Sequence, residues 1–300
     1  MDGQELAGNT GFGWIKLLIG MSMTLVVSLS IHVVMLQILG IPFPEFDGVS
    51  VWASFLNTML AVLAVIIFYS LAQPRLAQIS GPNRYIVVFL LYVMLKESFR
   101  GIIMNGVVTH GWGFDVVAAL PGLAYAFVLT SLVVLTTPKL RGIWLKVAGA
   151  AAIAAVAMFA VRPLLRSAFA PALKAAAHLD HAEVYAFPYG WQVLVPAYLT
   201  YAEPVIACML IAVLVWQRLS TNTLTRMLQF AALVLLIRGM LLPTFVYSFY
   251  SKAKLPIAML SQSQFLLETL ALAILTALTW QISARSMPAV QPIMDAQLSK

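Results

Sequence analysis

The chain has 300 residues, of which 62% are hydrophobic and 10% charged, with a formal net charge of +7. A soluble domain is about half apolar and about a quarter charged, so this composition excludes a soluble globular protein, a disordered chain and a disulfide scaffold. Only one cysteine, Cys208, is present, so no intrachain disulfide can form. The sequence predicts an all-α polytopic membrane protein whose single integral membrane domain covers residues 1–300.

Apolar runs long enough to cross a bilayer recur eight times along the chain. A hydrocarbon core of about 30 Å requires roughly 20 apolar residues in a helix. The first run is too long for the apolar core of a signal peptide and has no basic residue before it, so we expect it to be retained as a membrane helix. The eight predicted spans are 14–40, 51–73, 85–108, 116–136, 143–161, 193–217, 227–250 and 257–284.

The distribution of Lys and Arg predicts the orientation of these spans. An even number of spans puts both termini on one side, and that side carries about twice as many basic residues near helix ends as the other. We therefore expect a bacterial inner-membrane protein with both termini in the cytoplasm, and we expect its charge to set orientation and not to bind nucleic acid. The basic residues on the expected cytoplasmic side are Lys16, Arg75, Arg84, Lys139, Arg141, Lys146, Arg218, Arg226, Arg285 and Lys300.

The longest connection, 162–192, is expected on the outer face. Asp180 and Glu183 have the spacing of a helix N-terminal capping pair, which predicts a short surface helix that begins there. His178 and His181 are three residues apart and could share a helix face as metal ligands. Because capping already accounts for their acidic neighbours, we predict no metal site.

Two short sequence matches suggest an internal duplication. The segment 14–17 resembles 144–147, and Arg-Gly pairs occur deep in the third and seventh spans, at 100–101 and 238–239. These matches predict a 4+4 repeat with halves 14–141 and 142–285. Four spans in each half would make the halves parallel, related by an axis along the membrane normal. The alternative is chance similarity between apolar helices.

Charged side chains inside predicted spans are costly and call for partners. Glu97 and Arg100 lie on one helical turn and can pair, whereas Lys96 is rotated by about 100° from Glu97. Arg238 is expected to pair with Glu268 or, as second choice, with Glu203. Pro204 is expected to kink the sixth span. The candidate ligand-binding or buried charge cluster, at similar membrane depth, consists of Glu97, Arg100, Glu203, Arg238 and Glu268.

The cluster favours a transporter or permease-like protein with a polar cavity that opens to the outer face. Two buried arginines favour an anionic or lipid-like ligand. The charges could instead only hold the bundle together, in which case the chain would be a non-catalytic scaffold or sensor subunit of a larger envelope complex. Beyond the lipid bilayer, the expected partners are another membrane protein or a second copy of the chain.

An intramembrane transferase or hydrolase is the third alternative. The sequence contains no Gly-rich phosphate loop, no His-Glu-x-x-His and no Gly-x-Ser-x-Gly motif. No two histidines lie at matching depth on different predicted spans, which argues against a haem site. We therefore expect no catalytic residue, no cofactor and no metal, and we favour binding or transport over catalysis.

Overall fold

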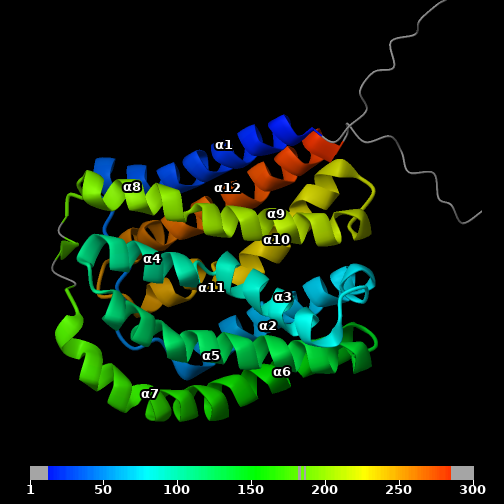
Figure 1. Ribbon diagram of the computed structural model, residues 1–300, viewed down its shortest axis with the longest axis horizontal. Helices are drawn as coiled ribbons and strands as arrows, with labels where there is room; N and C mark the ends of the chain where they lie inside the picture. Colours follow the sequence, from blue (N-terminus) through cyan, green and yellow to red (C-terminus); the bar gives the residue numbers. More distant parts are fainter. Residues whose placement is uncertain (1–12, 182–183, 186, 285–300) are drawn as a thin grey trace, which may run out of the picture.

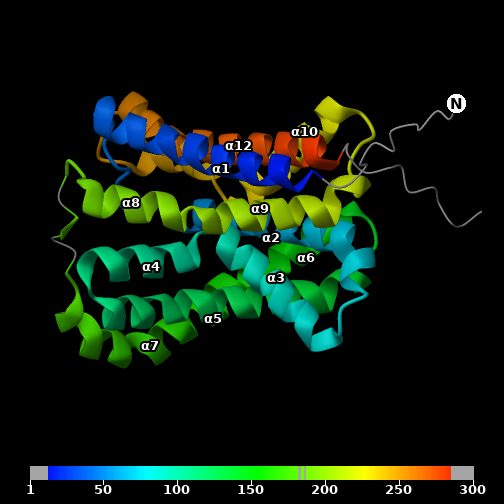
Figure 2. The same cartoon turned by 45° about the horizontal axis from the view of Figure 1, so that its top comes forward.

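The computed structural model describes residues 13–181, 184–185 and 187–284 as a bundle of helices that run mainly along one long axis (Figures 1 and 2). No strand occurs in this described part of the chain. The helices of the N-terminal half are α1 (Trp14–Val33), α2 (Val51–Leu76), α3 (Gly81–Leu95), α4 (Ser98–Thr109) and α5 (Trp112–Thr136). Those of the C-terminal half are α6 (Ile143–Val156), α7 (Arg162–Ala176), α8 (Trp191–Thr200), α9 (Ala202–Val215), α10 (Thr223–Arg238), α11 (Leu241–Phe245) and α12 (Leu255–Ala284).

The first and last helices pack along each other over most of their length, as both views show (Figures 1 and 2). Gly20 permits this close approach, because a Cβ added there would lie 2.4 Å from the side chain of Thr279. At the end of the pair, the backbone N–H of Gly13 donates to the carbonyl of Ser283 at 3.4 Å. The two ends of the main described region, 13 and 284, therefore lie at the same end of the bundle.

Within the described residues, six helical segments are long and apolar enough to cross a membrane. They include α1, α2, α5 and α12, the segment from α6 to the end of α7, and the segment formed by α8 and α9. The third and seventh predicted spans, 85–108 and 227–250, are not continuous helices, because each is interrupted near its middle. The predicted count of eight spans is therefore not confirmed by the described residues, which hold six such segments.

The fifth predicted span, 143–161, also differs from expectation. The helix does not end at Val161 but continues through a π-helical turn (Ala157–Val161) into α7 (Figure 1). Pro163 is tolerated because it lies in the first turn of α7. Residues 182–183 and 186 of the surface helix expected to start at Asp180 lie outside the described residues, so that prediction is not tested. The extension of α7 ends in a short turn (Ala177–Leu179) immediately before Asp180. Its proposed capping partner, Glu183, lies outside the described residues.

Three helix interruptions divide these segments, and two of them, at Pro204 and Gly239, have a local cause in the sequence. Between α3 and α4, Glu97 adopts a left-handed conformation (φ 59°), which is uncommon for a residue other than glycine. Between α8 and α9, Pro204 lacks the N–H that would bond to the carbonyl of Thr200, and the kink predicted there is present at Tyr201. After α10, Gly239 has a φ of +70°, and its N–H bonds to the carbonyls of Leu235 and Leu236 close the helix end.

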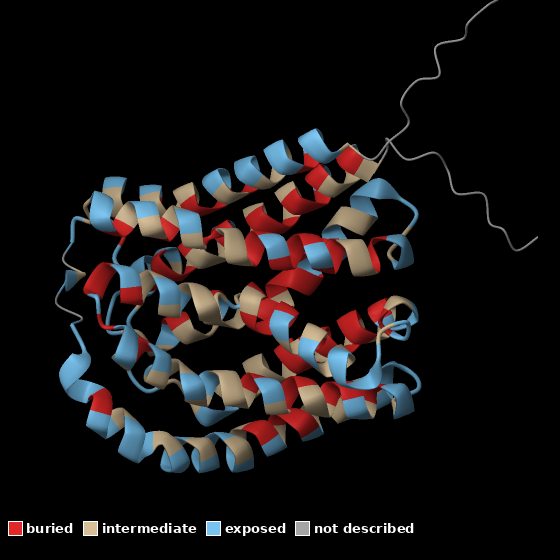
Figure 3. Cartoon of the chain, in the orientation of Figure 1, coloured by how far each residue is buried: buried red, intermediate tan, exposed pale blue. Residues whose placement is uncertain are grey.

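Burial follows the pattern expected of a bundle in lipid. The inward faces of the helices are buried and the outward faces exposed (Figure 3), yet many of the exposed side chains are large and apolar. On α1, Ile15 and Leu18 are 74% and 63% exposed. Such contiguous apolar exposure is unusual for a soluble monomer, and it supports a membrane-embedded protein.

Candidate ligand site at the helix interruptions

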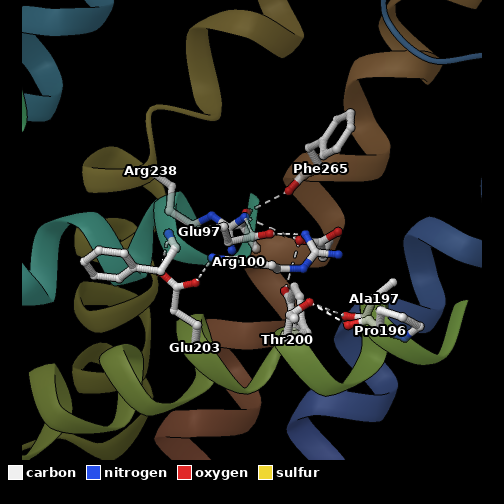
Figure 4. Close-up of polar contacts among 12 residues, drawn as sticks. Glu97, Arg100, Pro196, Ala197, Thr200, Glu203, Arg238 and Phe265 are labelled. Atoms are coloured by element: carbon white, nitrogen blue, oxygen red, sulfur yellow. Dashed lines mark hydrogen bonds and ion pairs between the residues drawn. The ribbon is translucent and has the colours of Figure 1, made fainter. Parts of the chain in front are cut away.

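The three helix interruptions meet inside the bundle (Figure 4). Lys96, at the end of α3, donates from Nζ to the carbonyl of Arg238 at the end of α10, at 3.3 Å. The first turn of α4 contacts α9 near Tyr201, because the N–H of Phe99 donates to Glu203 Oε1 at 3.1 Å. Free backbone groups at helix ends need partners, so the convergence of three interruptions concentrates polar atoms at one depth.

Two of the six charged side chains cap these helix ends. The carboxylate of Glu203 accepts the N–H groups of both Phe99 and Arg100 at the start of α4, where the helix dipole favours a negative charge. The ammonium group of Lys96 lies at the C-terminal end of α10, where the dipole favours a positive charge. Both side chains therefore have a structural task that their sequence context did not reveal.

The other four charges form one ionic network. Glu97 lies between two arginines and accepts a hydrogen bond from Arg100 through Oε2 and another from Arg238 through Oε1 (Figure 4). Arg238 Nη2 is also 3.4 Å from Glu268 Oε1, and the hydroxyl of Tyr201 donates to this same carboxylate oxygen at 3.0 Å. The guanidinium of Arg100 lies over the ring of Tyr201, 5.3 Å from its centroid.

These contacts can be compared with the sequence predictions. The expected pairs Glu97–Arg100 and Arg238–Glu268 are both present. Glu203, the second candidate partner of Arg238, caps α4 instead. The structure brings all five predicted site residues together around the helix interruptions.

Arginine nitrogens in the network remain without partners. Arg238 is only 6% exposed, and its Nε and Nη1 atoms have no hydrogen-bond partner among the described residues. Nε of Arg100 is likewise buried and unpartnered. Buried polar groups are nearly always hydrogen-bonded, and charged ones cost the most when they are not. The site therefore has an excess of cationic donors over acceptors.

A cavity of about 350 Å³ adjoins this network. Its polar wall consists of the charged side chains and His32, whose Nδ1 is buried without a partner. Such a shape, mainly apolar with convergent polar groups at one end, is typical of small-molecule sites. The polar wall comprises His32, Lys96, Glu97, Arg100, Arg238 and Glu268. The apolar wall includes Leu29, Leu36, Met104, Val193, Leu194 and Phe265.

The cavity is also lined by Gln37, Tyr185 and Tyr189. Tyr185 donates from its hydroxyl to Asn105 Oδ1 at 2.6 Å, and the N–H of Tyr189 donates to Gln37 Oε1 at 3.1 Å. Burial, with a smaller contribution from Asp115, raises the pKa of Tyr185 to about 12, so its hydroxyl keeps its proton at neutral pH. Two residues of the segment 162–192, Tyr185 and Tyr189, thus line the cavity.

Several lining residues escaped sequence analysis. Lys96 is rotated by about 100° from Glu97 on an ideal helix, yet it lines the same cavity. His32 and Tyr185 in the lining, and Tyr201 in the adjoining network, carried no signal of spacing or motif, since their roles depend on packing between distant segments. The described residues contain no group of three or more His, Cys, Asp or Glu side chains that could hold a metal ion.

Comparison of the chain with protein-family models, curated proteins and solved structures finds no match. The case for a function therefore rests on the geometry of the site alone.

Proposed function

We propose that this protein is a multi-pass inner-membrane transporter or permease-like protein that binds an anionic, lipid-like small molecule in the cavity beside Arg100 and Arg238. The observation that carries the proposal is the set of unpartnered, buried guanidinium nitrogens that belong to two arginines whose side chains line a mainly apolar cavity. An acidic group on the ligand would satisfy those nitrogens. Its hydrocarbon body would lie against the apolar wall around Leu194 and Phe265.

The proposal includes an outward-facing cavity and cytoplasmic termini. Segment 162–192, expected on the outer face, supplies Tyr185 and Tyr189 to the lining of the cavity. The start of α1 and the end of α12 lie together at one end of the bundle, as an even number of crossings requires. Opposite locations of reporter fusions placed after Lys300 and within 162–192 would support this topology, and identical locations would contradict it.

The proposal also includes two related halves, each with four crossings. Packing supports this, because contacts in one half have counterparts in the other: α3 packs on α9 as α10 packs on α2, and α5 packs on α2 as α12 packs on α9. Likewise α1 packs on α12, and α5 packs on α6 and α7. The interrupted segments α3–α4 and α10–α11 would correspond, and both reach the proposed binding site. Interrupted helices at the interface of repeats are a recurring feature of transporters.

Binding can be tested with a simple anionic amphiphile, 1-hexanesulfonate, and the purified protein in mild detergent. Isothermal titration calorimetry should show saturable binding of hexanesulfonate, with none of the matched cation hexyltrimethylammonium. Arg100→Met should weaken the affinity about 10- to 100-fold, the range expected for loss of one charged hydrogen bond. Arg166→Met, which removes an exposed arginine of α7, is the matched control and should bind like the unaltered protein. Absence of hexanesulfonate binding would contradict the proposal.

Transport itself requires a second measurement. Proteoliposomes containing the protein should take up radiolabelled hexanesulfonate faster than protein-free vesicles, and Arg100→Met should abolish the difference. The alternative function is a non-catalytic scaffold or sensor subunit, which is favoured by the internal pairing of Glu97 with two arginines. A sensor would bind hexanesulfonate without transporting it, whereas a scaffold would do neither and would co-purify with a membrane-protein partner.

A further inference from the structure

Glu97 occupies the position that an anionic ligand would need. Its two carboxylate oxygens engage Arg100 and Arg238 from opposite sides, and all three side chains line the cavity. The unpartnered nitrogens that the ligand needs belong to the same two guanidinium groups that Glu97 binds through other nitrogens, so an acidic group reaches them fully only if Glu97 gives up part of its bonding. The internal carboxylate and the ligand therefore compete for the same two guanidinium groups.

The charge balance of the site determines what else must change when an anion binds. Three basic and three acidic side chains surround the helix interruptions, so the fully ionised set has a formal charge of zero. Adding an anion to this buried set would leave an uncompensated negative charge, which is costly away from water. Uptake of one proton by a carboxylate restores neutrality.

Glu97 is the carboxylate best placed to take that proton. It contacts both arginines, whereas Glu268 retains a hydrogen bond from Tyr201 and Glu203 retains two backbone N–H groups. Its backbone lies at the hinge between α3 and α4 in the left-handed conformation, and strained residues of this kind are concentrated at functional sites. The titratable and charged groups that face it are His32 of α1, Lys96 at the end of α3, Arg100 of α4, Tyr201 between α8 and α9, Glu203 of α9, Arg238 of α10 and Glu268 of α12.

We propose that Glu97 is an internal counter-anion that the ligand displaces, so that each anion binds together with one proton and the pair crosses the membrane without net charge. The proton adds to the Glu97 carboxylate as its bonds to Arg100 and Arg238 pass to the ligand, and it comes from the same aqueous side as the anion. Release of the anion returns Glu97 to the arginines and the proton to water. This inference rests on the proposed function, because it assumes that an anion binds in the cavity.

The test measures hexanesulfonate affinity between pH 5 and pH 8, a range in which the probe keeps its charge. One-proton coupling predicts that the affinity of the unaltered protein increases by up to about tenfold per pH unit as the pH falls. Calorimetry in buffers of different ionisation enthalpy should show uptake of up to one proton per anion. The measurement of proton uptake uses the unaltered protein, so it tests the inference even if a variant fails to fold.

Glu97→Gln keeps the volume of the side chain and removes its charge. It should bind hexanesulfonate with little pH dependence and, at pH 8, at least about tenfold more tightly than the unaltered protein. Asp115→Asn, which alters a buried carboxylate outside this cavity, is the matched control and should keep the full pH dependence.

The failures are distinguishable. No hexanesulfonate binding at any pH would overturn the proposed function together with this inference. Binding whose affinity does not change with pH, or without proton uptake, would overturn the inference alone. Loss of the pH dependence in Glu268→Gln, with its retention in Glu97→Gln, would also overturn it by assigning the proton to Glu268.

Discussion

Two neighbouring regions of the bundle differ in the volume that their side chains leave empty. Consecutive residues of α10 join the two regions. Where α2, α3, α9 and α10 pack together around Ile237, apolar side chains such as Val65 and Phe68 leave a cavity of only about 10 Å³. One residue further along, Arg238 lines a cavity of about 350 Å³. The apolar faces of these helices pack tightly, whereas the charged residues at the interruptions of the same helices line the larger cavity. The first region can account for stability, and the second is the part open to a ligand.

The largest expected effect comes from Arg238→Met, because it strands the buried carboxylates of Glu97 and Glu268. Breaking one partner of a buried ion pair costs about 3–5 kcal/mol, so the free energy of unfolding should fall by about that amount. Adding Glu268→Gln should recover part of the stability but not the binding of hexanesulfonate. Denaturant unfolding in detergent and calorimetry measure the two quantities. Full binding in the double variant would show that Arg238 has no role in the ligand site.

A substitution in the apolar core should lower the free energy of unfolding and leave ligand affinity unchanged. Phe230 is fully buried and packs edge-to-face on Trp216, with ring centroids 6.0 Å apart. Phe230→Ala should cost about 3 kcal/mol in the free energy of unfolding through the cavity it leaves. At temperatures where the variant is folded, its affinity for hexanesulfonate should equal that of the unaltered protein. A large change in affinity would mean that the two regions are coupled and not independent.

A smaller effect is expected at the boundary of the ligand site. Tyr201→Phe removes the hydroxyl that donates to Glu268 and keeps the ring beneath Arg100. Loss of one hydrogen bond should lower the free energy of unfolding by about 1 kcal/mol. Thermal unfolding of the two proteins side by side measures the difference. A cost as large as that of Arg238→Met would show that Tyr201, and not Arg238, holds the network together.

The smallest effect is expected at a surface ion pair. Lys252 Nζ lies 3.7 Å from Asp47 Oδ2, and the two side chains are 74% and 69% exposed. Pairs of this kind contribute less than about 1 kcal/mol, because water and salt screen them. Lys252→Met should therefore leave both the unfolding transition and hexanesulfonate binding unchanged. It also serves as a lysine control for variants of Lys96, whose ammonium group bonds to the end of α10.

Sequence reasoning predicted the class of fold and the charged residues of the site, because both follow from local composition. The apolar runs of α2, α5 and α12 identify these helices directly, and the cost of intramembrane charge singles out Arg238 and Glu97. The interruptions are less visible. Pro204 predicted the interruption between α8 and α9, and the glycine directly after Arg238 is typical of a helix end. The residue type at Glu97 gives no sign of its left-handed backbone. The capping roles of charged side chains depend on which helices meet, which no local pattern contains.

The cavity is expected to be reachable from the outer aqueous phase and to hold an anion beside the arginines. Leu194 of α8 lines the cavity, while Leu210 of α9 is 44% exposed on the outside of the bundle, so the two leucines form a matched pair. Cys208 is fully buried and should contribute no background labelling.

The decisive measurement is the labelling rate of Leu194→Cys by a membrane-impermeant thiosulfonate added outside right-side-out vesicles, with and without hexanesulfonate. We predict rapid labelling that hexanesulfonate slows, and no labelling of Leu210→Cys in lipid. Labelling of Leu194→Cys only from the cytoplasmic side, or at a rate that hexanesulfonate does not change, would contradict an outward-facing anion site.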